Sequence, residues 1–112
     1  TGLEIPLAWT PGFDGCAAIE VYPAATLKSH GIRCQGYKGA GDVEVRREML
    51  AGLGSLMALP DDLRPALERA DALDACVCLL AASDFLNGSA VPPPEAGIAR
   101  KEGWIWVRGC GT

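Results

Sequence analysis

The chain has 112 residues, of which 49% are hydrophobic and 21% are charged, and its formal net charge at pH 7 is −4. This balance is typical of one soluble globular domain and excludes a disordered chain. The longest apolar run, residues 75–82, is far shorter than the roughly 18 residues that a membrane span requires. The acidic pI of about 4.8 argues against strong non-specific binding to nucleic acid.

Charge is unevenly distributed along the sequence. Basic residues gather in the first half, and acidic residues gather between residues 61 and 74. The basic group is Lys28, Arg33, Lys38, Arg46 and Arg47. A basic region that faces an acidic pocket suits a metal-dependent phosphodiesterase, although two ordinary solvated faces produce the same pattern.

The cysteines are odd in number, lack C-x-x-C spacing and accompany a single histidine, His30. They are Cys16, Cys34, Cys76, Cys78 and Cys110. This pattern favours reduced thiols in a cytoplasmic protein and excludes a His-rich zinc site. A thiol enzyme that uses Cys34 or Cys78 is the least favoured functional class, because no spacing pairs either cysteine with the histidine.

The first predicted elements are short. Residues 1–15 carry no sustained hydrophobic period, so we expect an irregular lead-in with a short strand at residues 4–7. Alternation over residues 17–22 predicts a strand with Glu20 on one face. The proline that follows suits the first turn of a helix over Ala24–Ser29.

Residues 35–41 form a glycine-punctuated loop that lacks the residue order of a nucleotide-binding P-loop. Lys38 is a candidate phosphate contact in this loop, although a solvated lysine is the default interpretation. Asp42 is the expected N-cap of a helix that continues to about Ala58. A further helical segment begins near Pro65, where the missing N–H is harmless.

Two carboxylates interrupt the apolar helix predicted over Asp71–Leu86. Its core-facing stripe consists of Leu73, Val77, Leu80 and Ala81. Asp71 and Asp74 are three residues apart, so their Cβ atoms lie about 5–6 Å from each other. A capping box at the helix N-terminus explains the pair without a ligand. The alternative is a divalent-cation site on the wall of a cleft.

The last predicted elements are an extended loop over residues 91–95 and a strand over residues 102–107. In that strand, Trp104 and Trp106 share one face.

Three separated pieces, taken together, resemble a known family. They are the stretches Ile19–Leu27, Ala70–Ala75 and Glu102–Trp106, with Gly36-Tyr37-Lys38 between the first two. In this order they resemble uncharacterised bacterial and archaeal proteins that are described as predicted nucleases with an RNase H-like fold. The resemblance implies an α/β fold with a mixed sheet and packed helices, and one domain over residues 16–108.

The resemblance also implies a site for Mg²⁺ or Mn²⁺ and hydrolysis of a phosphodiester in nucleic acid. Glu20 would be the acid on the central strand, and Asp74, together with Asp71, the acid on the last main helix. Tyr37 and Lys38 are the candidate substrate-binding residues. Oxygen-rich ligands of this kind suit Mg²⁺ or Mn²⁺ rather than zinc.

The family's opening half, a strand with a metal-binding aspartate followed by a hairpin, has no counterpart of adequate length here. The chain therefore resembles the C-terminal half of a truncated RNase H-like domain, and we expect an incomplete nuclease. The alternative is a non-catalytic interaction module that forms a homo-oligomer over an exposed sheet edge. Tyr22, Trp104 and Trp106 would be its interface anchors.

Overall fold

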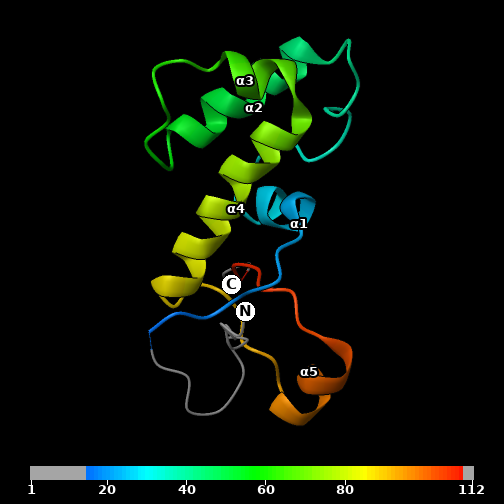
Figure 1. Cartoon of the computed structure of the whole chain (residues 1–112), viewed down its shortest axis with the longest axis vertical. Helices are drawn as coiled ribbons and strands as arrows, with labels where there is room; N and C mark the ends of the chain where they lie inside the picture. The colour runs from blue at the N-terminus through cyan, green and yellow to red at the C-terminus, as the bar shows by residue number, and fades with distance from the viewer. Residues whose placement is uncertain (1–14, 110–112) are drawn as a thin grey trace, which may run out of the picture.

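The computed structural model describes residues 15–109, and these residues contain five α-helices (Figure 1). The helices are α1 (Pro23–Ser29), α2 (Val43–Gly54), α3 (Arg64–Glu68), α4 (Ala70–Leu86) and α5 (Ala96–Glu102). Among the helices of this described part, none combines the length and the apolar character that crossing a bilayer requires.

Local sequence signals explain where α1 to α3 begin. A proline occupies the first turn of both α1 and α3, where its missing N–H is not needed. Asp42 is the N-cap residue of α2, as its position predicts, but α2 ends at Gly54 rather than near Ala58. The helical predictions from Pro23 to Leu86 are therefore confirmed, with an error of a few residues at one end.

The first three helices, α1, α2 and α3, all contact α4 and pack around it. In Figure 1, α2 and α3 lie against the first half of α4, α1 lies beside its middle, and α5 lies at the opposite end of the molecule. We call the buried apolar side chains between these four helices the helical core; they are Leu27, Tyr37, Met49, Leu50, Leu53, Ala66, Leu73, Val77 and Leu80.

The predicted α/β class with a mixed sheet is wrong, because residues 15–109 contain five helices and no strand. The two segments predicted as strands do meet, but only at a parallel bridge between Glu20 and Ile105. Trp106 N–H donates to the Glu20 carbonyl across 3.1 Å. A second, antiparallel bridge joins Ala90 to Arg108.

The start of α1 explains why the parallel bridge does not extend into a ladder. The Tyr22 carbonyl, two residues beyond Glu20, accepts hydrogen bonds from Ala25 and Thr26 of α1 instead of from a strand. On the other segment, Gly103 has φ of +82°, so the chain turns just before the bridge. Residues 96–102, which alternation does not predict as helical, form α5.

A second apolar group, which we call the small cluster, lies where these extended segments meet the end of α4. Ala90 and Trp106 are its buried members, and Ala17, Ile19, Phe85 and Trp104 pack against them. The rings of Phe85 and Trp106 meet edge to face with centroids 4.8 Å apart. Trp106 therefore serves internal packing. The strand predicted at residues 4–7 and Cys110 lie outside the described residues.

Candidate functional site

The two aspartates of α4 do not cap the helix. Arg69 is the N-cap residue and makes no side-chain capping bond, so the capping-box explanation of the acids is wrong. Asp71 lies exposed in the first turn, where the helix dipole favours a negative charge. Asp74 lies one turn later and is partly buried. The acids are thus left available to other partners.

The partners of Asp74 come from the glycine-punctuated loop. The Tyr37 hydroxyl donates to Asp74 Oδ1 across 2.7 Å, and Lys38 Nζ lies 3.8 Å from Asp74 Oδ2. Tyr37 is buried in the helical core, whereas the Lys38 side chain is largely exposed. Burial raises the pKa of the Tyr37 phenol, and the hydrogen bond to Asp74 and its charge raise it further. Tyr37 therefore stays a proton donor to Asp74.

Two glycines give the loop its path. Gly36 has φ of +73°, in the left-handed region that side chains disfavour. Gly39 N–H donates to Asp42 Oδ2 across 2.8 Å, and a Cβ at Gly39 would lie only 2.7 Å from that oxygen. The loop is therefore tied to the start of α2 on one side of Lys38. The residues that precede Tyr37 and Lys38 line a hollow of about 460 Å³; they are Arg33, Cys34, Gln35 and Gly36.

Glu20, the third predicted acid, has different surroundings from Asp74. It is exposed, and its carboxylate lies beside Gly103, where an added Cβ would be 3.1 Å from Oε1. Within residues 15–109, no group of three or more His, Cys, Asp or Glu side chains is placed to hold a metal ion. The structure therefore brings Tyr37 and Lys38 to Asp74 but does not add Glu20 to the same group. The role of Glu20 as a metal ligand stays a prediction.

The environment of Cys78 does not support the hypothesis of a thiol enzyme. Cys78 follows Asp74 by one helical turn. Burial raises the pKa of the Cys78 thiol, and the negative charge of Asp74 raises it further. A raised pKa lowers the fraction of thiolate, which is the nucleophilic form. Cys78 is therefore a poor nucleophile in this environment.

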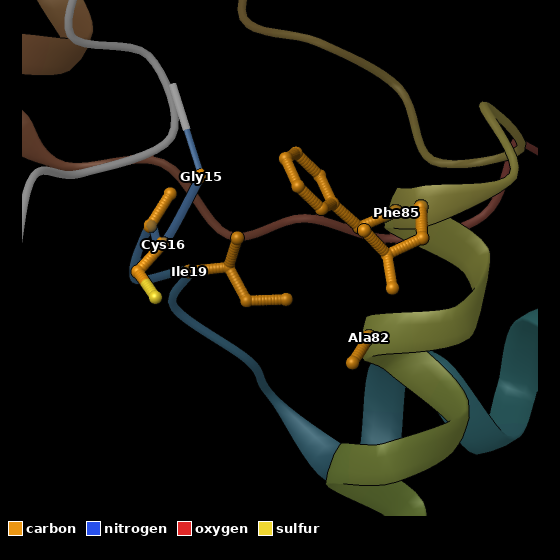
Figure 2. A pocket seen from close by; sticks show the side chains of 7 residues that line it. Gly15, Cys16, Ile19, Ala82 and Phe85 are labelled. Carbon is orange, nitrogen blue, oxygen red and sulfur yellow. The ribbon is translucent and has the colours of Figure 1, made fainter. Parts of the chain in front are cut away.

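An apolar groove with a volume of about 690 Å³ lies between the segment at residues 15–19 and the end of α4. Figure 2 shows Ile19 on that segment facing Phe85 and Ala82 of α4. Gly15, Cys16, Ala17 and Leu86 complete its lining. The groove belongs to the small cluster and carries no charged side chain, so it is chemically distinct from the surroundings of Asp74.

Two polar features escape sequence reasoning. His30 Nε2 lies 2.7 Å from Asp84 Oδ2, and both side chains are buried between α1 and α4. Arg46, which the sequence groups with the surface basic residues, is buried in the helical interior. Its spacing from Met49, Leu50 and Leu53 is the available signal, because these positions share one face of a helix.

These features define a small helical domain in which a basic, glycine-punctuated loop lies over an acidic turn of the longest helix. The chain belongs to the family described as Protein of unknown function (DUF429), whose model matches residues 11–97. The matched range includes Glu20, the Tyr37–Lys38 pair and both aspartates of α4, and it ends within α5. Neither the curated proteins nor the solved structures contain a significant match to the chain.

Proposed function

We propose that this chain is a metal-dependent nuclease domain that acts on phosphodiesters at the Asp71–Asp74 turn of α4. The observation that carries the proposal is the convergence of Tyr37 and Lys38 on Asp74, across 2.7 Å and 3.8 Å. This arrangement places a partly buried carboxylate and an exposed ammonium group side by side. A phosphodiester substrate requires both, one to hold a cation and one to meet the phosphate.

The donor set at this turn fits Mg²⁺ or Mn²⁺. Asp71 and Asp74 are three residues apart on one helix, and carboxylate oxygens are the ligands that these hard cations prefer. Mg²⁺ keeps several waters and is commonly bound by one or two carboxylates together with substrate phosphates, so a group of three acids is not required. When bound, such a cation supplies Lewis-acid stabilisation of the charge that develops on a phosphodiester.

The remaining side chains have separable tasks. Tyr37 occupies Asp74 Oδ1 and so fixes the orientation of the carboxylate, which leaves Oδ2 for a cation. Lys38 lies near Oδ2 but is 72% exposed, so its side chain is free to turn toward a phosphate. Arg33 is a further basic side chain, and it lines the hollow beside the loop. We keep Glu20 as a candidate additional ligand.

The test is Mn²⁺-dependent cleavage of fluorescently labelled DNA and RNA oligonucleotides. Asp74→Asn should reduce the cleavage rate by at least ~100-fold, because one carboxylate ligand is lost. Lys38→Gln should mainly raise KM. Asp61→Asn, which changes an exposed aspartate in the loop before α3, is the matched control and should retain the wild-type rate. An unchanged rate in Asp74→Asn, or no metal-dependent cleavage by the wild type, would overturn the proposal.

A non-catalytic, self-associating module is the second candidate function. The observation that favours it is the apolar groove of the small cluster, beside which Leu86 is 82% exposed. Exposed apolar surface of this kind is costly unless a partner covers it. Sedimentation at increasing concentration should then show a dimer that Leu86→Asp abolishes. Ile98→Asp, at an exposed apolar residue on α5, should leave the dimer intact. A monomer at all concentrations would reject this candidate.

A further inference from the structure

Arg46 is the unusual side chain of the helical core. It is only 1% exposed, yet within residues 15–109 no carboxylate lies at ion-pair distance from its guanidinium. Burial of a charge without a counter-charge is unfavourable, so its hydrogen bonds must account for its position. The neighbouring Arg47 is exposed and pairs with Glu44 across 3.5 Å, which is the ordinary surface alternative.

The three bonds of Arg46 go to backbone carbonyls on two different segments. Nη1 donates to the carbonyls of Tyr37 and Gly39, in both cases across 2.7 Å. These carbonyls belong to the residues on either side of Lys38. Nε donates across 2.6 Å to the carbonyl of Leu67 in α3, four residues before Asp71.

We propose that Arg46 is the positioning residue of the candidate site and acts as a clamp between its two halves. The guanidinium fixes the loop on both sides of Lys38 and ties it to the segment that leads into the Asp71–Asp74 turn. The fixed loop then holds the Tyr37 hydroxyl within hydrogen-bond distance of Asp74. The planar, forked donor set of arginine suits this task, whereas lysine offers a compact point charge. The assignment rests on the proposed nuclease function for its catalytic consequence.

The decisive comparison is Arg46→Lys against Arg47→Lys. In a Tyr22→Phe background, Tyr37 is the only tyrosine, so its ring signals in proton–carbon NMR spectra are assigned directly. At neutral pH, these ring signals should keep their positions in Arg47→Lys but shift in Arg46→Lys, because the loop that carries Tyr37 is no longer fixed beside Asp74. The Mn²⁺-dependent kcat/KM should fall at least ~10-fold in Arg46→Lys alone. A folded but less stable Arg46→Lys protein in which the Tyr37 ring signals keep their positions would overturn the proposal.

A second measurement applies if Arg46→Lys does not fold. In the otherwise wild-type protein, Tyr37→Phe should shift the Arg46 Nε–Hε signal in nitrogen-15 NMR spectra, because coupling between two groups is reciprocal. The Arg47 signal should stay in place. An unshifted Arg46 signal would overturn the clamp.

These readouts also separate the clamp from the nuclease function. The tyrosine and arginine NMR spectra require neither metal nor nucleic acid. If both respond as expected but the wild type cleaves nothing, the nuclease function is rejected and the clamp is supported. If the wild type cleaves and Arg46→Lys cleaves equally well, the positioning role of Arg46 is rejected and the nuclease function is retained.

Discussion

The helical core and the small cluster differ in how completely they exclude water. In the helical core, Leu27, Leu53, Leu73 and Val77 are fully buried, whereas the two buried residues of the small cluster each keep 8% exposure. The helical core also holds Tyr37 and borders Asp74, while the small cluster borders Glu20 and the apolar groove. Regions with fewer buried apolar contacts open at lower free energy. The candidate site thus rests on the more stable part of the molecule.

The largest expected effect comes from the buried pair between α1 and α4. His30→Ala leaves the Asp84 carboxylate buried without its partner, which should lower the free energy of unfolding by about 3–5 kcal/mol. Denaturant titration measures this change. Lys28→Ala, at an exposed position of α1, is the control and should change it by less than about 0.5 kcal/mol. A loss below about 1 kcal/mol in His30→Ala would show that the pair is not buried.

Two leucines on α4 test the burial of the helical core directly. Leu73→Ala should cost about 2–5 kcal/mol in the free energy of unfolding, because Leu73 is fully buried and the substitution leaves a cavity. Leu79→Ala makes the same chemical change on the same helix at a residue that is 65% exposed, so it should cost far less. Equal losses in the two variants would contradict the assignment of the core face.

The pH dependence of stability tests the environment of Tyr37. Its folded-state pKa is raised, so the folded state binds the proton more tightly than the unfolded chain, whose tyrosine has a pKa of about 10. The stabilisation is present below pH 10 and is lost as pH rises toward the folded pKa. Between pH 9 and pH 11 this group should lower the free energy of unfolding by about 1.4 kcal/mol. Tyr37→Phe should remove that part of the dependence, and an identical slope in both proteins would refute it.

The smallest effect is expected in the small cluster. Phe85→Leu removes the edge-to-face contact between two rings whose centroids lie 4.8 Å apart, those of Phe85 and Trp106. The substitution should lower the free energy of unfolding by about 0.5–1.5 kcal/mol. Near-ultraviolet circular dichroism should report a changed tryptophan environment, while Tyr37 ionisation stays as in the parent. A change at Tyr37 would mean that the two regions are not separable.

The helices from α1 to α4 are predictable because their signals are local. The signals are the prolines in the first turns of α1 and α3 and the apolar period of α4, and each of them lies within a single segment. The proximity of Tyr37 and Lys38 to Asp74 is not local. The resemblance to a family indicates Tyr37, Lys38 and Asp74 as candidate site residues, but it does not predict the hydrogen bond between Tyr37 and Asp74, which joins residues 37 positions apart.

The strands predicted at residues 17–22 and 102–107 do not form, and the reason is physical. Alternation at residues 17–22 specifies an extended segment, but a ladder requires a partner whose backbone groups remain free over several residues. Here Tyr22 gives its carbonyl to α1, and only Glu20 and Ile105 form the parallel bridge. The burial of Arg46 is equally hard to foresee, because its partners are backbone carbonyls that composition and charge patterns do not show.

Calorimetric titration of the protein with Mn²⁺ shows whether the Asp71–Asp74 turn binds a cation. We expect saturable binding by the wild type and by Asp61→Asn, and loss of binding in Asp74→Asn. Glu20→Gln, measured in parallel, shows whether the acid beside the small cluster contributes. Wild-type binding that survives in Asp74→Asn, or no saturable binding by the wild type, would contradict the assignment of a cation site to the Asp71–Asp74 turn.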